Sequence, residues 1–548
     1  MVSTLGGVFL GLLGLAGAVC VWHFWGRRRA VAAQRRSGLA AVTVVVLGDV
    51  GHSPRMCYHA LCLAQQPACV AHVDVVASRG TAPPPALTAL GPDRVRLVLM
   101  APFAPLPASV PRALRRALFV LYAPAKVAAQ CARLFWALAV RARPATHILV
   151  QNPPSLPTLA LAWAAARLTG AVYVVDWHNL GHTLLALALG AAHPFVRAYA
   201  AFERVFGARC ADAHLAVTHA LAAHLRGPWG RVPGRVPVRV LHDQPAAAFR
   251  PLAPAERGAF LARFLGDQLA HGAPDLATDA QRAIVRTCVA EAETSTPAAQ
   301  RTVAVLVSGT SWTPDEDFGV LLNALRAYDD AVSAAGQSAG TDGRTLRDLL
   351  VVITGRGPQK EMYRALLHEN PLAHVAVLTA WLSLPDYQTA LGAADVGISL
   401  HQSSSQLDLP MKVLDMFGAG LPVFARGYPW FVQSFPLCCF LFMYVFFFVV
   451  SSLEEELVED GVTGKTFHNS LELAELLKRY CSFEGAPALS KMSESLFYFL
   501  FSLTLACSYF MNLCVQTEVV QRRETTGSWE DEWARQGLPL FVLTPSAH

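Results

Sequence analysis

Charged residues are scarce in this chain. Asp, Glu, Lys and Arg together make up 16% of its 548 residues, whereas hydrophobic residues make up 53%. This composition is apolar for a soluble protein and indicates contact with a membrane. Acidic and basic residues nearly balance, at a formal net charge of +5. Without a strong positive excess, the sequence argues against nucleic acid as a partner.

Paired cysteines and glycosylation acceptors are missing as well. The 12 cysteines form no CxxC pair and do not alternate with histidines at the spacing of metal ligands. We therefore expect no metal site. No Asn-x-Ser/Thr acceptor occurs in the sequence. Together these absences favour a protein that faces the reducing cytosol.

The amino-terminal segment is the first long apolar run. Residues 5–25 contain no Asp, Glu, Lys or Arg, and they are long enough to span a bilayer, which takes about 20 residues. Trp22 and Trp25 lie at the end of the run, and arginines follow at 27–29. A cleaved signal peptide carries its positive charge before the apolar run, and none precedes this one. We predict a single-pass signal anchor over residues 1–26, with the rest of the chain in the cytosol.

Apolar strand-like segments then alternate with helical patterns. The segments lie at residues 41–47, 70–76, 95–100, 147–150, 171–175 and 213–217. Alternation of this kind predicts a doubly wound parallel sheet. We assign residues 40–245 to a Rossmann-like amino-terminal domain, and a chain of this length is expected to hold about two to four domains.

A second alternating series follows an Ala-rich helical region, residues 246–300, which we assign to a linker. Its strand-like segments lie at residues 302–309, 349–354, 375–379 and 395–400. We assign residues 301–548 to a second Rossmann-like domain. The sequence thus predicts an α/β fold in which two Rossmann-like domains face each other across a cleft, with ligands at the carboxyl ends of the strands.

The stretch 401–423 carries the clearest ligand-binding pattern. It begins with Ser403, Ser404 and Ser405. A serine-rich loop that opens a helix turns free N–H groups and the positive dipole end towards one point, which suits a phosphate. Lys412 adds a cation, and Asp415, one turn further on the same face, suits ribose hydroxyls. The alternative is a solvated amphipathic helix with an ion pair between Asp408 and Lys412.

Six motifs occur in order along the chain. They are VVVLGDVGHSPRM, QNPPSLPTLA, VVDWHN, SGTSWTPDEDF, ITGRGP and HQSSSQLDLPMKVLDMFGAGLPV. In this order and at these intervals they closely resemble the chitobiosyldiphosphodolichol β-mannosyltransferase family. The resemblance covers most of residues 43–423, then LVEDGVTG at 457–464, and WEDEWARQGLPL near the carboxyl terminus.

The resemblance implies a GT-B fold and an inverting transfer of mannose from GDP-mannose to GlcNAc2-diphosphodolichol. The product would carry the first β-1,4-mannosyl linkage of the lipid-linked oligosaccharide for N-glycosylation. The implied location is the cytosolic face of the endoplasmic reticulum membrane, in agreement with the predicted anchor. Other mannosyltransferases of the dolichol pathway are further candidate partners. Neither a tightly bound cofactor nor a metal ion is implied.

Inversion at the anomeric carbon needs a base for the acceptor hydroxyl and stabilisation of the departing diphosphate. Asp49 is our first candidate for the base, followed by His178 and Asp176, because all three come directly after strand-like segments. Each has a structural alternative. Asp49 would cap the following helix, and Asp176 with His178 would form a hydrogen-bonded pair that holds their loop.

The loop after the first strand supplies candidates for contact with the acceptor or a diphosphate. They are Gly48, Gly51 and Arg55. Arg55 comes one helical turn after the glycine loop and carries the charge that a diphosphate needs. The alternative is an ordinary surface arginine.

The implied donor-binding residues follow strands of the second domain. They are Gly355, Arg356, Gly357, Ser403, Ser404, Ser405, Asp408, Lys412 and Asp415. The two glycines allow a backbone to approach the nucleotide, although a plain tight turn needs glycines too. Arg356 and Lys412 are the cations best placed for the pyrophosphate.

Two details depart from related patterns. Retaining transferases of similar fold have two glutamates around this helix, whereas here Leu407 takes the first position, with Asp408 beside it, and Asp415 takes the second. Asp315 and Asp317 have the spacing of a metal-binding pair, but they lie in a helix-start pattern, where capping is the better interpretation.

Two further apolar runs, near residues 431–452 and 496–515, interrupt the second domain. As membrane spans they would carry LVEDGVTG across the bilayer, away from its domain. Removing about residues 430–452 would restore a connection of ordinary length. We interpret both runs as non-native insertions, such as retained introns, and spliced transcripts that contain both would contradict this interpretation.

Three functions fit the sequence. The first is the membrane-anchored inverting mannosyltransferase. The second is a related glycosyltransferase with another nucleotide sugar, because spacing alone does not distinguish guanine from uracil. The third is an inactive membrane-bound partner of a glycosyltransferase complex. Its support is the pair of apolar runs close to the donor-binding residues.

Overall fold

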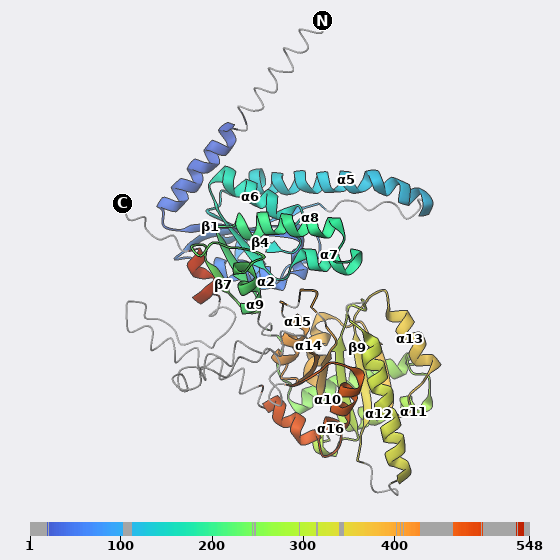
Figure 1. Cartoon of the computed structure of the whole chain (residues 1–548). Coiled ribbons are helices and arrows are strands. Elements are labelled where there is room, and N and C mark those ends of the chain that lie inside the picture. The colour runs from blue at the N-terminus through green and yellow to red at the C-terminus, as the bar shows by residue number, and fades with distance from the viewer. Residues whose placement is uncertain are drawn as a thin grey trace, which may run out of the picture. The chain divides into compact units, whose positions relative to one another are not determined.

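Two parallel β-sheets organise the chain, one in each of two units (Figure 1). The computed structural model describes residues 19–101, 112–427, 464–496 and 533–541. Gaps fall at 20, 244, 246–247, 295, 314–315, 339–344, 402, 406, 409, 495 and 534. Contacts along the chain group Met1–His242 with Ser528–His548 in the first unit and Asp243–Gly527 in the second.

The sheet of the first unit has parallel strands in the order β3-β2-β1-β4-β5-β6-β7. The strands are β1 (Ala40–Asp49), β2 (Val70–Ser78), β3 (Val95–Met100), β4 (His147–Asn152), β5 (Val172–Trp177), β6 (Ala213–Ala216) and β7 (Val238–Val240). Every strand predicted within residues 40–245 is present. Runs of Val and Ala such as Val44 and Val45 are fully buried, as expected for a parallel sheet covered by helices.

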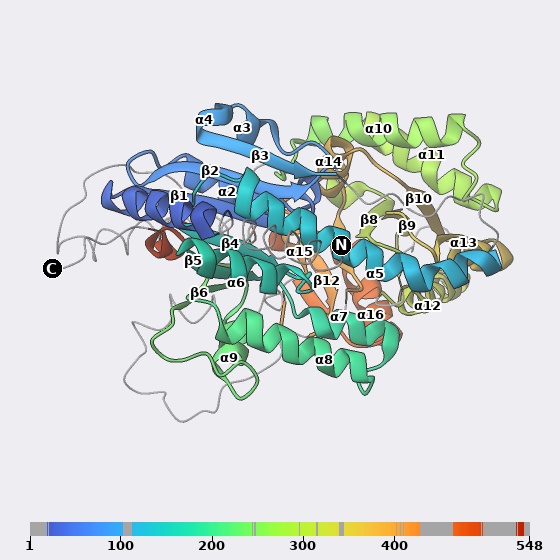
Figure 2. The same ribbon diagram turned by 90° about the horizontal axis from the view of Figure 1, so that it is seen from above.

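Helices connect these strands and pack back onto the sheet (Figure 2). They are α2 (Pro54–Ala64), α3 (Pro85–Thr88), α4 (Gly91–Arg94), α5 (Arg112–Trp136), α6 (Thr158–Thr169), α7 (Gly181–Leu189), α8 (Pro194–Phe202) and α9 (His219–Arg226). Gly170 ends α6 at a φ of +77°, a left-handed conformation that glycine adopts without strain, and the chain turns there into β5.

The sheet of the second unit is also parallel, in the order β10-β9-β8-β11-β12-β13. The strands are β8 (Val303–Gly309), β9 (Asp348–Thr354), β10 (Val375–Ala380), β11 (Val396–Ser399), β12 (Val423–Arg426) and β13 (Gly464–Phe467). The helices are α10 (Pro254–Ala270), α11 (Asp279–Glu293), α12 (Phe318–Ser338), α13 (Lys360–Glu369), α14 (Leu384–Ala393), α15 (Met411–Gly418) and α16 (Ser470–Tyr480). The prediction of two Rossmann-like parallel sheets is confirmed.

The helical region at residues 246–300 is not a free linker. Phe260, Leu265 and Val285 of α10 and α11 share a buried core with Val305 of β8 and Leu350 of β9. These apolar faces lose their contact with water on the sheet. The two helices therefore form one layer of the second unit.

The carboxyl-terminal segment also differs from its assignment to the second domain. Trp533 and Phe541 are fully buried and belong to the hydrophobic core of the first unit, beside Val174 and Leu215. Their rings stack with centroids 6.0 Å apart. Burial of two large aromatic side chains fixes this tail to the first sheet.

The amino-terminal helix is described from residue 21 to residue 36. The Arg27 guanidinium donates to the Ala142 carbonyl at 2.9 Å, and His23 Nε2 lies 2.8 Å from the Ala139 carbonyl oxygen. These contacts attach the helix to the first unit. Within the described ranges, no helix has the length and apolar character needed to cross a bilayer, and most of the predicted span 5–25 lies outside them.

The two predicted insertions lie largely outside the described residues, which stop at 427 and at 496 and resume at 464 and at 533. The strands on either side of the first insertion, β12 and β13, are parallel neighbours in the sheet. Leu496, where the second predicted insertion begins, is fully buried and packs in the core beside Phe417 and Leu421. The second unit thus includes this residue.

Candidate functional site

Asp176 is the centre of a buried polar cluster at the carboxyl end of β5. Its carboxylate is fully buried and accepts two parallel hydrogen bonds from Arg55, from Nε at 2.8 Å and from Nη2 at 2.9 Å. Nη1 of Arg55 donates to the Leu241 carbonyl at 2.9 Å. A bidentate arginine that is itself held by a backbone carbonyl is a suitable partner for a buried carboxylate.

Two histidines share the Oδ2 atom of Asp176. Nε2 of His59 lies 2.9 Å from it and Nε2 of His178 lies 2.8 Å from it. The indole N–H of Trp533 donates to Nδ1 of His59 at 2.6 Å. Because Nδ1 of His59 accepts, its Nε2 carries the proton and donates to Asp176. His59 is therefore fixed as the Nε2–H tautomer.

His178 is the member of this cluster that reaches solvent, with 22% of its side chain exposed. Its Nε2–H donates to Asp176, which leaves the lone pair of Nδ1 as an acceptor. A histidine that is oriented by a carboxylate in this way has the arrangement of a general base. The structure joins His178 and Asp176 as the sequence suggested, and the arrangement fits both catalysis and the looser interpretation of a loop-holding pair.

Charges around Asp176 decide its ionisation. Burial raises the pKa of this carboxyl group, but the guanidinium charge of Arg55 and the interactions with His178 and His59 outweigh burial and hold the pKa well below its usual range. Burial also lowers the pKa of His59, more than Asp176 raises it. Asp176 thus stays ionised and orients His178, and it is a poor base itself.

Asp49 lies at the end of β1, two strands away from β5 in the sheet. It is the N-cap of a 3-10 turn at Val50–His52. Its carboxylate accepts from the backbone N–H groups of Gly51 at 3.0 Å and of Thr81 at 2.7 Å. The hydrogen bond from Thr81 is the largest cause of the lowered pKa of Asp49. Both oxygens of the Asp49 carboxylate thus accept hydrogen bonds, and the lowered pKa makes the carboxylate a weaker base. These facts favour a capping role for Asp49 over a role as general base.

Arg55 is not a surface residue, since it is only 4% exposed, and that alternative is wrong. Its bonds to Asp176 and Leu241 also leave it poorly placed to receive a diphosphate. Gly51 packs so tightly that an added Cβ would lie 2.8 Å from Thr81 Cβ, whereas Gly48 has open space beside it. Of the predicted acceptor residues, Gly48 alone borders free space.

A second histidine–carboxylate pair, which sequence reasoning missed, lies close by in the chain. Glu203 is fully buried and accepts from His182 Nδ1 at 2.6 Å, from Asn152 Nδ2 at 2.8 Å and from Ser155 Oγ at 2.8 Å. His182 stacks on Trp229. Asn152 and Ser155 belong to the QNPPS motif, so the motif serves to hold this glutamate.

The loops after β8 and β9 press against each other in the second unit. A Cβ atom at Gly355 would lie 1.8 Å from the Thr310 carbonyl oxygen, and one at Gly357 would lie 1.8 Å from that of Ser311. The glycines therefore permit the approach of a neighbouring loop. Arg356 is exposed, and its guanidinium lies 4.3 Å from the centroid of the Trp381 ring, a cation–π contact.

Lys412, the predicted phosphate-binding cation, forms an ion pair with Glu316. Glu316 is buried and also accepts from Thr310 Oγ1 at 2.5 Å and from the Ser311 N–H at 2.8 Å. The alternative interpretation, an ion pair between Asp408 and Lys412, is not what the structure shows, because Lys412 pairs with Glu316 instead. Sequence reasoning missed Glu316 because it considered only the flanking aspartates of PDEDF.

The serine loop folds onto its own aspartate. Ser403 Oγ donates to the Asp408 carboxylate, and Ser405 Oγ accepts from the Leu407 N–H at 3.2 Å. Burial raises the pKa of Asp408. Ser404 lies between the two bonded serines. The loop is thus ordered by side-chain bonds in front of α15.

Asp415 lies on α15, and burial raises its pKa to about 7. Burial raises the pKa of Tyr387 well above its usual range, and the nearby carboxylate of Asp415 raises it further. Among the described residues burial alone causes this shift, and a half-buried carboxyl group whose pKa no cation lowers suits a ligand that donates hydroxyl groups. Over the described ranges, no cluster of three or more His, Cys, Asp or Glu side chains has the geometry to hold a metal ion.

Comparisons with known proteins give the class. A scan against models of protein families finds no match. The chain is 39% identical over 519 residues to UDP-glycosyltransferase TURAN of Arabidopsis thaliana, covering 92% of this chain and 97% of that protein. It is 36% identical over 527 residues to the chitobiosyldiphosphodolichol beta-mannosyltransferase of Homo sapiens, covering 95% of both chains. For the Mus musculus enzyme of the same name, identity is 34% over 550 residues, covering 99% of this chain and 97% of that protein.

Similar solved structures include a glycosyltransferase from Rickettsia africae, with a TM-score of 0.45, 12% identity, and coverage of 84% of this chain and 92% of that one. WaaG, a glycosyltransferase of lipopolysaccharide biosynthesis, has a TM-score of 0.42, 13% identity, and coverage of 84% of this chain and 94% of that one. The protein is a glycosyltransferase that is built on two Rossmann-like parallel sheets. With such identity over nearly its whole length, the chain belongs to the chitobiosyldiphosphodolichol β-mannosyltransferase family.

Proposed function

We propose that this protein transfers mannose from GDP-mannose to GlcNAc2-diphosphodolichol with inversion, forming a β-1,4 linkage. The support from sequence is its identity to relatives that bear the name of this activity. The observation that carries the chemistry is the 2.8 Å hydrogen bond from His178 Nε2 to Asp176. It leaves Nδ1 of a partly exposed histidine ready to accept a proton.

In the proposed reaction, the acceptor hydroxyl oxygen attacks the anomeric carbon of mannose from the face opposite the diphosphate. The bond from that oxygen to carbon forms while the bond from carbon to the phosphate oxygen breaks. The hydroxyl proton passes to Nδ1 of His178, and GDP leaves with the bonding electrons. Asp176 stabilises the imidazolium that results.

On the donor side, Lys412 would leave Glu316 for the diphosphate, and the N–H groups at the start of α15 would add their dipole. The carboxylate of Asp415 would accept from ribose hydroxyl groups. Arg356 is a further exposed cation for the pyrophosphate. Ser403, Ser405 and Asp408 would act by holding the loop in front of the helix, because they bond one another.

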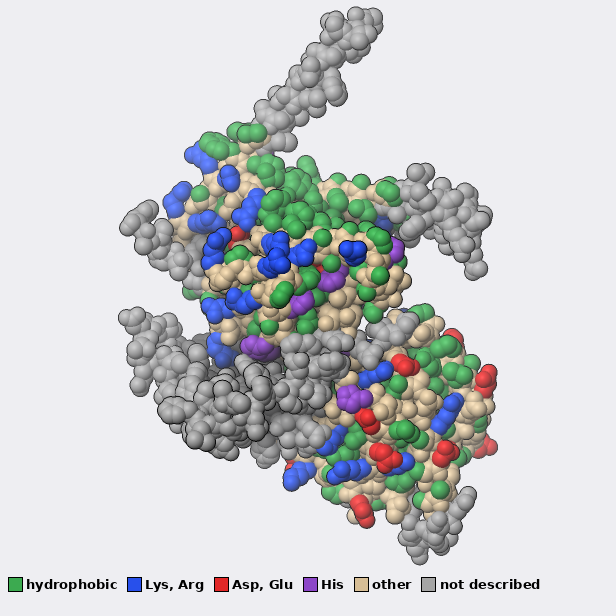
Figure 3. Space-filling view, in the orientation of Figure 1, with side chains coloured by type: hydrophobic (Ala, Val, Ile, Leu, Met, Phe, Trp, Pro, Cys, Tyr) green, Lys and Arg blue, Asp and Glu red, His purple; other side chains and the backbone are tan. Residues whose placement is uncertain are grey.

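Membrane attachment is the remaining part of the proposal. We place the protein at the endoplasmic reticulum membrane, anchored by residues 1–26, with both units in the cytosol. Trp22, Trp25 and Trp136 are more than half exposed, and basic and hydrophobic side chains lie together on the face of the first unit shown in Figure 3. Such a surface suits anionic lipid headgroups, and tethering raises the effective concentration of a lipid-borne acceptor.

A second candidate is the same reaction type with a UDP-sugar, which the name of the Arabidopsis thaliana relative favours. The deciding experiment supplies the full chain with GDP-mannose or UDP-GlcNAc and a GlcNAc2-diphospholipid. Transfer from GDP-mannose alone supports the first candidate, and transfer from UDP-GlcNAc alone supports the second. If neither is used by folded protein, the inactive-partner hypothesis is correct.

The role of His178 is tested in the same assay with His178→Ala. Loss of a general base should lower the turnover rate by about 10² to 10⁴ with little change in KM. His271→Ala, at the end of α10, is the matched control and should keep full activity. His182→Ala compares the second histidine pair, and a larger loss there than at His178 would reassign the base.

A further inference from the structure

A small pocket lies at the amino ends of the strands in the second sheet. Arg301 lies two residues before β8, Arg347 directly precedes β9 and Asp395 directly precedes β11. The cavity has a volume of about 190 Å³. The loops that carry Gly355 and Ser403 follow the carboxyl ends of β9 and β11, at the opposite edge of the same sheet. The pocket is therefore distinct from the candidate donor site.

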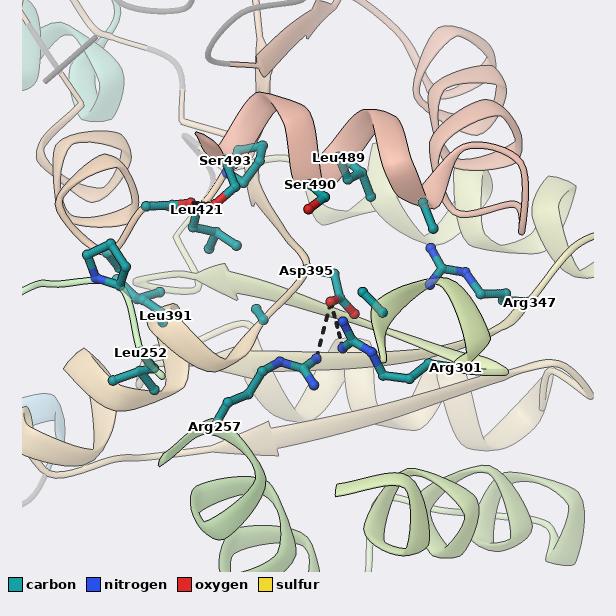
Figure 4. Close-up of a pocket in the computed structure, with 18 residues that line it drawn as sticks. Leu252, Arg257, Arg301, Arg347, Leu391, Asp395, Leu421, Leu489, Ser490 and Ser493 are labelled. Carbon is teal, nitrogen blue, oxygen red and sulfur yellow. Dashed lines mark hydrogen bonds and ion pairs between the residues drawn. The ribbon is translucent and has the colours of Figure 1, made fainter. Parts of the chain in front are cut away.

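Three arginines supply the positive charge of this pocket, whose lining is otherwise mostly apolar. Arg257, Arg301 and Arg347 turn towards one space beneath the segment that carries Leu489 and Ser490 (Figure 4). Asp395 is the one acidic residue in that lining. Outside the lining, Glu291 is near enough to influence Arg257. Its Oε1 accepts from Thr302, and its buried Oε2 has no partner among the described residues. The three arginines therefore outnumber the two carboxylates, Asp395 and Glu291.

The hydrogen bonds of Asp395 do not satisfy the arginines. Asp395 accepts from Arg301 Nη1 at 2.9 Å, from Arg257 Nη2 at 3.2 Å and from the Val305 N–H at 2.8 Å. Both of its oxygens are occupied by these bonds. One carboxylate thus neutralises one of the three guanidinium groups.

Two buried guanidinium nitrogens lack an acceptor in the described part of the chain. Arg347 is 2% exposed and donates from Nε to the Cys481 carbonyl at 3.0 Å, but its Nη2 has no partner. Arg301 is 8% exposed, and its Nε has no partner. An unpaired buried charge is costly, so the site is built for an anion.

We propose that this pocket binds a phosphoryl group, as inorganic phosphate or as part of a small soluble phosphate ester. Planar guanidinium forks match phosphate oxygens, and several forks around one space match a tetrahedral anion better than a planar carboxylate. The volume equals that of about six liquid water molecules, enough for one such group. Exposed Ser490 at the lining offers a hydroxyl donor.

The test is titration calorimetry of the full chain with inorganic phosphate at constant ionic strength. Arg347→Met removes one of the two unpaired donors, and Ser490→Glu places a competing carboxylate at the pocket while leaving every arginine in place. Each variant should weaken phosphate binding by about tenfold or more, the usual effect of losing a charge-assisted hydrogen bond. Arg263→Met, an exposed arginine of α10, is the matched control and should bind as the wild type does.

Circular dichroism confirms folding of each variant before titration. If Arg347→Met does not fold, Ser490→Glu decides the question, because its side chain lies at the surface. Absence of phosphate binding by the wild type overturns the proposal, and so does equal binding by Ser490→Glu. A glycerol phosphate titration distinguishes an ester from the free anion. No outcome depends on the identity of the sugar donor.

Discussion

The indole N–H of Trp533 lies 2.6 Å from Nδ1 of His59 and joins the carboxyl-terminal tail to the second helix of the chain. His59 in turn donates to Asp176, which accepts from His178. The tail thereby sets the tautomer of a buried histidine next to the candidate base. The contact gives a physical reason why the tail belongs to the first unit. Without Trp533, the buried Nδ1 atom of His59 would lose this hydrogen-bond donor.

Trp533→Phe should keep most of the aromatic packing and lose this one hydrogen bond. We expect the free energy of unfolding to fall by about 1 to 3 kcal/mol, because the Nδ1 atom of His59 is left buried and unsatisfied. Urea unfolding measures the change. Trp136→Phe, at an exposed position, serves as the control and should change stability by less than about 0.5 kcal/mol. Equal effects of the two substitutions would contradict the role of the hydrogen bond.

Asp176→Asn tests the charge that holds Arg55 and the two histidines. Arg55 would remain buried without its carboxylate, so we expect a loss of about 3 to 5 kcal/mol in unfolding free energy. The carboxyl pKa is already held low by Arg55, so the charge is present across the physiological pH range. Guanidinium unfolding measures the effect. Asp279→Asn, where the side chain is 97% exposed, should cost at most about 1 kcal/mol.

Lys412→Met tests the donor side. Removal of the cation should weaken GDP binding by about tenfold to a hundredfold, as expected for a charge-assisted hydrogen bond to phosphate. Fluorescence titration of GDP measures the change. Lys360→Met, which removes a cation from the start of α13, provides the comparison. Unchanged GDP affinity in Lys412→Met would show that this lysine serves only to pair with Glu316.

Asp415→Asn should change how stability depends on pH. The folded-state pKa of Asp415 is about 7, above its ordinary value of 3.8. The folded protein therefore holds a proton that the unfolded chain loses, and the stability contributed by protonated Asp415 is full below pH 4 and disappears as pH rises through 7. The variant lacks this decline. The unfolding free energy of the variant minus that of the wild type should therefore be about 2 to 4 kcal/mol larger at pH 8 than at pH 4.

Chemical unfolding of both proteins at pH 4, 6 and 8 provides the measurement. Parallel stability curves for the two proteins would contradict the raised pKa. Addition of GDP should reverse the trend if Asp415 accepts ribose hydroxyl groups, because the ionised carboxylate then gains donors. Asp317→Asn, whose carboxylate caps its own loop at the Gly319 N–H, is the control.

Local pattern was enough to predict both sheets. The run at 40–49 and the run at 303–309 became central strands, because continuous Val, Ala and Leu segments must be buried on both faces. Motif order also identified the family, and the hydrogen-bonded pair of Asp176 and His178, which the sequence offered as the alternative to direct catalysis, is present. These features depend on neighbours in the chain or on the alternation of strand and helix.

Other features were decided by contacts between distant segments. Sequence spacing allowed an Asp408–Lys412 pair as the alternative to phosphate binding, yet Lys412 pairs with Glu316, which lies 96 positions away. Trp533 binds His59 across 474 positions. Helices α10 and α11 form a layer of the second unit where a linker was predicted, since their apolar faces fit the sheet.

The sequence by itself determined which segments become strands and helices, and which polar side chains follow the strands. Only the tertiary structure decided which of these side chains are ionised, paired or exposed. Arg55 shows the reason: its charge is compatible with a phosphate or a carboxylate, and burial beside Asp176 selects the carboxylate. Desolvation and partner geometry are properties of the folded chain, so no local pattern contains them.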